Sequence, residues 1–301
     1  MDLWIPITIA ATVIQNVRAV GQRWLLGRVS VGAAAYGRFL YGFPLTLLFL
    51  IAVCASDGRA PPAPSLPFLA LATIGALSQS LGNAMFVRLV RSSNFIVMTT
   101  YSKMETVFSP VFSFFLLDDR LSVAGVTGIV VAVLGVMLMA SARSASSLSA
   151  LIGACLRAPA SQGILVGAIY AVTSTSYRAA AFEVGDVGFA MQGLTLLAWA
   201  TGIQAVAGGM YLAWQRSPVL SEVFREWRYV AWIGITGVSA SACWLCAFAL
   251  QKTGYVLAVG QIELVFAFVA SHLLFKERAH RNELVGILVT VVGILLVVMA
   301  R

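Results

Sequence analysis

Charged residues are scarce in this sequence. Asp, Glu, Lys and Arg make up only 11% of its 301 residues, whereas 60% are hydrophobic, and the mean hydropathy is +0.91. Soluble globular domains carry about 25% charged residues, so this composition excludes an ordinary soluble domain. Apolar runs of membrane-spanning length recur along almost the whole chain. Because a bilayer offers no water to unpaired backbone groups, these runs predict an all-α polytopic membrane protein.

Cysteine and histidine are also few, with four and two copies. Cys243 and Cys246 have the CxxC spacing, but they lie in the apolar stretch SACWLCAFAL without a second CxxC. Zinc and redox sites need further ligands or a polar, accessible thiolate, so we expect no metal and no cofactor. The sequence also lacks HExxH, GxxxxGK[ST] and GxSxG, the signatures of zinc proteases, P-loop ATPases and α/β-hydrolases. We therefore do not expect an enzyme.

The net charge of +8 arises from basic residues that stand mostly between the apolar runs. Membrane topology and anionic lipid headgroups account for basic residues at such places, so we expect the lipid bilayer as a partner and no nucleic acid. The N-terminal stretch MDLWIPITIAATVIQNVR has no basic n-region and no clear cleavage site. It predicts a first transmembrane helix that is retained, rather than a signal peptide.

One stretch of the chain occurs twice. Tyr101–Leu121 and Val259–Ala279 align without a gap, and this alignment places Glu105 on Glu263. Apolar matches are common in membrane sequences, so the polar and glycine matches carry the argument. The further identical pairs are Ser113 with Ser271, Arg120 with Arg278, Gly128 with Gly286, and Gly135 with Gly293. The chain therefore contains an internal duplication.

The hydrophobic pattern predicts ten helices in two sets of five. The expected helices cover about 3–21, 32–54, 68–87, 94–117, 123–142, 162–181, 187–214, 229–250, 255–275 and 284–300. This pattern divides one membrane domain into a first repeat 1–142, a Ser- and Ala-rich linker 143–161 and a second repeat 162–301. Because five crossings are an odd number, the second repeat must start from the opposite side. The halves are then expected to be inverted repeats about an axis in the membrane plane.

The orientation can be predicted from the loops. Those after the first, third, fifth, seventh and ninth helices hold most of the Lys and Arg residues found between helices. The positive-inside rule places these loops in the cytoplasm, and hence both termini outside.

Two carboxylates, Glu105 and Glu263, lie deep within apolar runs. Charging an unpaired acidic group near the bilayer centre costs at least about 2.5–3.5 kcal/mol, whereas a polar contact there contributes only about 0.6–2 kcal/mol. Burial favours the neutral form of a carboxyl, so either residue is suited to exchange a proton. Two interpretations remain open: the pair ties helices together, or it binds protons or substrate. We favour the second.

Helical spacing orders the polar residues around Glu105. Tyr101, Glu105 and Ser109 follow each other at intervals of four and share one face. Lys103 lies about 200° round the helix from Glu105, so it is expected to pair with another helix or to bend towards the cavity from its flank. Gln261 takes the place of Lys103 in the second copy, so the cavity need not be symmetric.

Two residues outside the repeated stretch complete the candidate site. Arg38 is a cation within the second apolar run, and Trp244 offers an indole ring for stacking or for a cation–π contact, although interhelical packing is its plainer role. The predicted set for binding substrate or protons is Glu105, Glu263, Tyr101, Lys103, Gln261, Arg38 and Trp244.

The duplicated segments METVFSPVFSFFLLDDRLSVAGVTGIVVAVLGVMLM and IELVFAFVASHLLFKERAHRNELVGILVTVVGILLV resemble the paired signature of EamA-type carriers of the drug/metabolite transporter superfamily. That signature has a Glu entering the helix, an acidic-Arg pair after it, and a final helix with spaced glycines. Arg38 also stands where such carriers often have an Arg. Two departures occur: Thr106 and Leu264 replace a frequent Pro, and Asp118-Asp119 replaces the more usual Gly-Glu.

The resemblance implies ten helices in two inverted repeats and a central cavity lined by the first four helices of each repeat. Helices five and ten would pack together as a peripheral brace, and the spaced glycines in both read as packing residues. It also implies secondary transport without ATP hydrolysis, typically export of amino acids or other small metabolites across a bacterial inner membrane. The mixed charge of the candidate site favours a zwitterion such as an amino acid.

Rival functions remain open at this stage. A membrane-embedded enzyme or a lipid flippase would also use buried Glu and Arg, and an efflux carrier for drugs and organic cations is a further alternative. A channel would need a continuous polar lining that the scattered Ser and Thr do not provide. The sequence leaves open the substrate, the direction, the coupling ion and whether the protein is a monomer or a homodimer.

Overall fold

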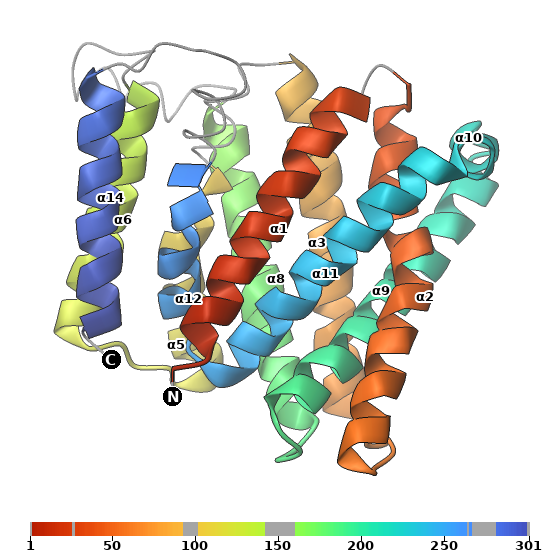
Figure 1. Ribbon diagram of the computed structural model, residues 1–301, viewed down its shortest axis with the longest axis horizontal. Helices are drawn as coiled ribbons and strands as arrows, with labels where there is room; N and C mark the ends of the chain where they lie inside the picture. The colour runs from red at the N-terminus through yellow and green to blue at the C-terminus, as the bar shows by residue number, and fades with distance from the viewer. Residues whose placement is uncertain are drawn as a thin grey trace. The chain divides into compact units, whose positions relative to one another are not determined.

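The computed structural model describes residues 2–25, 28–92, 102–141, 160–263, 265–266 and 281–299. Within these ranges the chain forms α-helices and no strands (Figure 1). The helices are α1 (Trp4–Leu25), α2 (Val31–Asp57), α3 (Leu66–Ser92), α5 (Glu105–Leu117), α6 (Val123–Ser141), α8 (Ala160–Glu183), α9 (Phe189–Trp214), α10 (Val219–Arg225), α11 (Trp227–Leu250), α12 (Thr253–Gly260) and α14 (Arg281–Met299). The all-α prediction is confirmed for the described residues.

Three of the described helices, α2, α9 and α11, are long and apolar enough to cross a membrane. Shorter apolar helical stretches cover Glu105–Leu117, Val123–Gly135 and Leu284–Met299. Most helix bounds agree with the predicted segments within a few residues. The short helix α10 was not predicted, because seven residues are too few to show a hydrophobic period.

The predicted fourth and ninth helices are interrupted, which corrects the expectation that each is continuous. Lys103 and Met104 form a turn before α5 begins at Glu105, and Gln261 forms a turn after α12 ends at Gly260. Lys103 and Gln261 are equivalent in the duplication, so both breaks occur at the same place of the repeat.

Hydrogen bonds show how each break is made. The Thr106 N–H donates to the Lys103 carbonyl and the Gln261 N–H to the Ala258 carbonyl, so both bonds span three residues instead of four. This is the tighter 3₁₀ pattern, which often marks a bend within a longer helix. At the second break the Gln261 side-chain amide donates to the Leu257 carbonyl at 3.0 Å and satisfies it.

The described helices form two compact units. Unit 1 comprises Met1–Ser80 and Ser176–Gln251, and unit 2 comprises Leu81–Thr175 and Lys252–Arg301. Each unit takes helices from both predicted repeats. This grouping reports packing, whereas the limits 1–142 and 162–301 concern the duplication, so those limits stay a prediction.

In unit 1, α2 packs against α9 and α11, and α1 packs against α11. Val223 of α10 and Val230 of α11 are fully buried and pack with Ala33 in the first turn of α2. Val223 therefore holds α10 against α2. Glu222 of α10 also accepts a 2.6 Å hydrogen bond from the backbone N–H of Ser30, the N-cap of α2. The short helix therefore closes one end of the α2–α11 pair.

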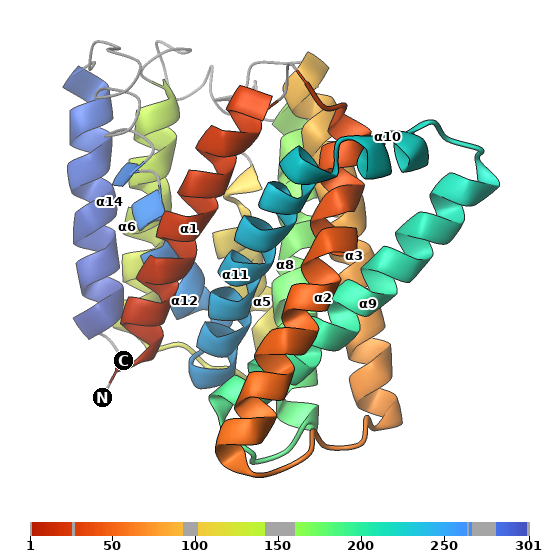
Figure 2. The same cartoon turned by 45° about the vertical axis from the view of Figure 1, so that its right-hand side comes forward.

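In unit 2, α6 and α14 lie side by side (Figures 1 and 2). A Cβ added at Gly128 would stand 2.7 Å from the Val297 backbone nitrogen and 3.0 Å from the Gly293 carbonyl oxygen. A Cβ added at Gly135 would stand 2.7 Å from the Gly286 carbonyl oxygen. The helices are therefore antiparallel, and their backbones touch. This confirms the predicted packing of the fifth and tenth helices through their glycines.

We predict that Gly135→Val lowers the apparent melting temperature of the purified protein by several degrees, because the added side chain must displace the α14 backbone. Overpacking of this kind costs typically about 1–3 kcal/mol. Ala124→Val, on an exposed position of the same helix, is the control and should change little. Equal stability of both variants would contradict the close packing of α6 on α14.

Candidate functional site

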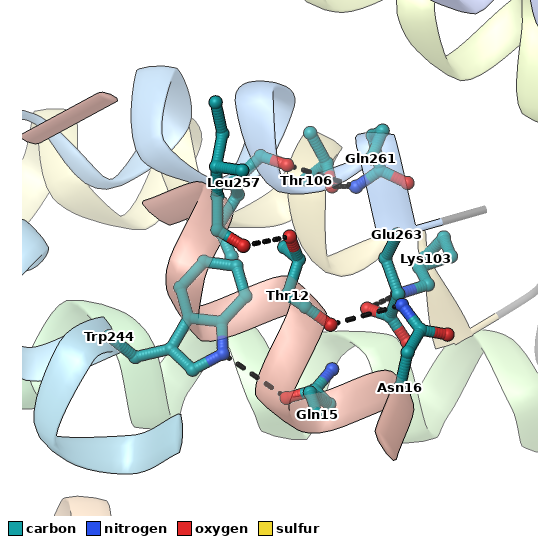
Figure 3. Close-up of polar contacts among 10 residues, drawn as sticks. Thr12, Gln15, Asn16, Lys103, Thr106, Trp244, Leu257, Gln261 and Glu263 are labelled. Atoms are coloured by element: carbon teal, nitrogen blue, oxygen red, sulfur yellow. Dashed lines mark hydrogen bonds and ion pairs between the residues drawn. The ribbon is translucent and has the colours of Figure 1, made fainter. Parts of the chain in front are cut away.

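Lys103 and Glu263 form an ion pair where the two interrupted helices meet in unit 2. The Lys103 Nζ lies 2.9 Å from the Glu263 Oε2, and the side chains are 20% and 17% exposed. Figure 3 shows the two side chains pointing towards each other. Two expectations were open for Lys103, pairing with another helix or bending towards the cavity from its flank, and the contact with Glu263 agrees with the first. This contact links the two copies of the duplicated segment at the point where each is bent.

The duplication makes Gln261–Glu105 the equivalent of the Lys103–Glu263 pair, but the structure does not form it. The Gln261 Nε2 donates instead to the Thr106 Oγ1 at 2.7 Å and to the Leu257 carbonyl at 3.0 Å (Figure 3). Gln261 is only 3% exposed, and its amide supplies the donor that the broken backbone ladder lacks. The predicted asymmetry of the site is therefore present in its hydrogen bonds.

Glu105 occupies the first turn of α5, where the positive end of the helix dipole favours a carboxylate. Its carboxyl lies within electrostatic range of Lys103 and Glu263. A Cβ added at Gly167 would stand 3.1 Å from the Glu105 backbone nitrogen, so α8 approaches this turn without a side chain between them. The first turn of α5 is therefore packed closely against α8.

These contacts set the electrostatics of the site. Among the described residues, the Lys103 ammonium pairs with the Glu263 carboxylate and also lies within electrostatic range of Glu105. The two carboxylates repel each other in a medium of low dielectric constant, whereas the Lys103 ammonium attracts both. That Glu105 binds a proton or a cationic group of a ligand stays a prediction.

Arg38 and Trp244 belong to unit 1, and Tyr101 lies outside the described residues. The Arg38 Nη2 donates to the Ser241 Oγ at 3.0 Å, and its stem rests on Gly237. The Trp244 Nε1 donates to the Gln15 Oε1 at 3.1 Å (Figure 3). Both side chains take part in contacts between helices of unit 1, and their role in binding substrate stays a prediction.

Sequence reasoning missed a polar cluster in unit 1. Gln204 of α9 donates to Gln79 of α3 at 2.8 Å, and the Tyr177 hydroxyl of α8 also approaches Gln79. Both glutamines were visible as polar residues inside apolar runs, in GALSQSLGN and TGIQAVAGG. A search for intramembrane carboxylates passes over neutral amides, although these carry the same need for partners in lipid.

Known proteins were compared with the chain. Residues 2–141 and 161–299 match the model of the EamA-like transporter family. Among solved structures, 28 chains match. One of them, described only as "Crystal structure of protein", is 15% identical in sequence, with a TM-score of 0.70. The match covers 99% of this chain and 97% of the chain in that structure. At that identity the likeness concerns the fold alone. A search of curated proteins finds no match.

The ion pair leads to a prediction about stability. Removing one partner of a fully buried pair costs about 3–5 kcal/mol and an exposed pair contributes about 0–1 kcal/mol, so this partly buried pair is expected to fall between these limits. We therefore expect Lys103→Met and Glu263→Met each to lower the melting temperature markedly, and the double variant to lower it less than the sum of both.

The control for this cycle is Arg120→Met, which removes an ion pair with Asp118 that is 76% and 71% exposed. Exposed pairs contribute about 0–1 kcal/mol, so this variant should stay close to the wild type. Strictly additive losses at Lys103 and Glu263 would contradict a stabilising pair.

Proposed function

Because the chain belongs to the EamA-like transporter family, a family of multi-pass membrane carriers, we propose that it is a secondary active transporter that exports amino acids or similar small metabolites. The family accounts for the transport function itself. The substrate, the outward direction and the coupling to protons are our proposal. We further propose a bacterial inner membrane with both termini outside, as the distribution of Lys and Arg suggests.

The observation that carries the proposal is the Lys103–Glu263 pair beside Glu105, at the meeting point of two interrupted helices. Secondary transporters often bind their solutes at discontinuous helices, where the backbone departs from the regular pattern. A continuous helix offers no backbone groups to a ligand, whereas these two turns bring an ammonium, two carboxylates and an amide together. Such mixed charge suits a zwitterion such as an amino acid.

The glycines of α6 and α14 support ten spanning helices in two inverted repeats. Gly128 faces Gly293, and Gly135 faces Gly286, so each glycine faces the repeat equivalent of the other. A two-fold axis between antiparallel helices produces this exchange. An axis of this kind in the membrane plane permits alternating access by rocking of one repeat against the other.

Proton coupling follows from the shared ammonium. When Lys103 is held by Glu263, Glu105 gains stability from a proton or from the amino group of a substrate. Exchange of one for the other at this carboxyl would link substrate release to proton uptake. We propose this exchange as the coupling step.

The test is export or counterflow of labelled amino acids by proteoliposomes, measured at several pH values for Glu105→Gln and Glu263→Gln. We expect Glu105→Gln to abolish proton-driven transport, since it cannot exchange a proton, and Glu263→Gln to slow transport by releasing Lys103. Glu183→Gln, at an exposed position, is the control and should transport as the wild type does.

Wild-type rates and wild-type pH dependence in both variants would contradict the carboxylate mechanism. Stimulation by lipid headgroups in place of amino acids would point to a flippase, and would remove the proposed substrate class.

A further inference from the structure

Three helices of unit 1 bring a neutral polar cluster together within otherwise apolar segments. The Gln204 Nε2 donates to the Gln79 Oε1 at 2.8 Å and to the Ala76 carbonyl at 3.1 Å. The Tyr177 hydroxyl donates to the same Gln79 Oε1 at 3.3 Å. Gln204 and Tyr177 are only 2% and 3% exposed. The cluster therefore lies inside the helix packing of this unit.

These contacts fix the orientation of both amides. Turning the Gln204 amide round would bring its oxygen against the Ala76 carbonyl and the Gln79 oxygen, two acceptors. Turning the Gln79 amide round would bring its nitrogen against the Gln204 nitrogen, and two donors would meet. The arrangement of donors and acceptors in the cluster is thus determined by its own hydrogen bonds.

One donor and one acceptor of the two amides remain. Both N–H groups of Gln204 and both lone pairs of the Gln79 oxygen are used. Within the described ranges, the Gln79 Nε2 and the Gln204 Oε1 make no hydrogen bond to protein, and neither belongs to the side-chain atoms sealed from solvent without a partner. One N–H₂ group and one carbonyl oxygen of adjoining side chains therefore keep their capacity for a hydrogen bond.

Contact between helices alone does not require this arrangement. Two facing amides can satisfy each other completely through a pair of hydrogen bonds, but here only one such bond forms. The Tyr177 hydroxyl takes the second lone pair of the Gln79 oxygen, and its ring is packed on Gly75, where a Cβ would lie 2.5 Å away. Tyr177 thus holds Gln79 as a positioning residue, with the amide nitrogen of Gln79 directed to another partner.

The neighbourhood of the cluster is polar as well. Thr201, one turn before Gln204 on α9, contacts Thr46 of α2 at 3.1 Å. Arg38 lies within electrostatic range of the Tyr177 hydroxyl. Polar side chains of α2, α3, α8 and α9 thus lie in this part of unit 1.

We propose that Gln79 and Gln204 bind a neutral group of the solute in which an N–H donor stands beside a carbonyl acceptor. A carboxamide has this edge, and so does a nucleobase such as uracil. The Gln79 Nε2 donates to the carbonyl of this group, and the Gln204 Oε1 accepts from its N–H. The inference rests on the proposed function only in treating the bound molecule as a transported solute.

The experiment measures dissociation constants for two matched pairs of probes by calorimetry on the purified full-length protein. L-Glutamine is compared with L-norleucine, which lacks the carboxamide, and uracil with 1,3-dimethyluracil, which lacks the N–H donors. We expect at least one polar probe to bind about tenfold or more tightly than its analogue, because two hydrogen bonds distinguish them. The pair that shows the preference identifies the source of the group.

Gln79→Leu and Gln204→Leu should remove this preference. Gln79→Glu is the second variant, because it keeps an oxygen that accepts from Gln204 and Tyr177 and replaces the amide donor by a carboxyl oxygen. Gln192→Leu, near the start of α9, is the matched control and should keep the preference. A structural role alone would lower the stability of the variants without changing the ratio of the dissociation constants.

Equal binding within both pairs, or no binding of any of the four probes, would overturn the inference. A preference that survives in Gln79→Glu and Gln204→Leu would also overturn it. If transport depends on Glu105 but the two probes of each pair bind equally, this inference is wrong and the proposed function is unaffected. If the protein prefers the polar probe of a pair but transports no solute, the proposed function is wrong and the binding site at Gln79 and Gln204 is still supported.

Discussion

The structure depends on the lack of water in the bilayer core, which obliges each polar group there to find its partner within the protein. Lys103 and Glu263 meet this requirement for two charges at once, at 2.9 Å. Their contact occurs where both helices depart from the regular ladder, and the Gln261 amide satisfies the Leu257 carbonyl that this departure releases. The bends and the polar side chains therefore stabilise each other.

The duplication explains the position of this contact, and the differences between the two copies explain its chemistry. A strict repeat would place a Lys or a Gln at both turns. With Lys103 in one copy and Gln261 in the other, only one of the two turns carries an ammonium, and it pairs with Glu263. In the proposed function, this inequality is what lets Glu105 exchange a proton for a cationic group of the solute.

Much of the fold could be predicted from the sequence, because hydrophobic runs report helices and the spaced glycines report the close contact of α6 with α14. The carboxylates Glu105 and Glu263 were found for the same reason, since charge is conspicuous among apolar residues. The breaks at Lys103 and Gln261 could not be predicted, because the first contains neither Pro nor Gly and a single glycine such as Gly260 is often tolerated within a helix. The hydrogen bond from Gln261 to Thr106 joins segments that are distant in the sequence. The cluster of Gln79 and Gln204 depends likewise on which helices become neighbours.

The central claim is that the carrier binds its solute at the two turns, where the interrupted helices meet. Hydrogen exchange followed by mass spectrometry measures this directly, with peptides that cover Thr106–Val107 and Gln261. The account predicts that these amides exchange faster than those in the middle of α11, because 3₁₀ hydrogen bonds open more readily, and that a transported solute changes their exchange. Exchange as slow as in α11, and unaffected by a solute that the protein transports, would contradict it.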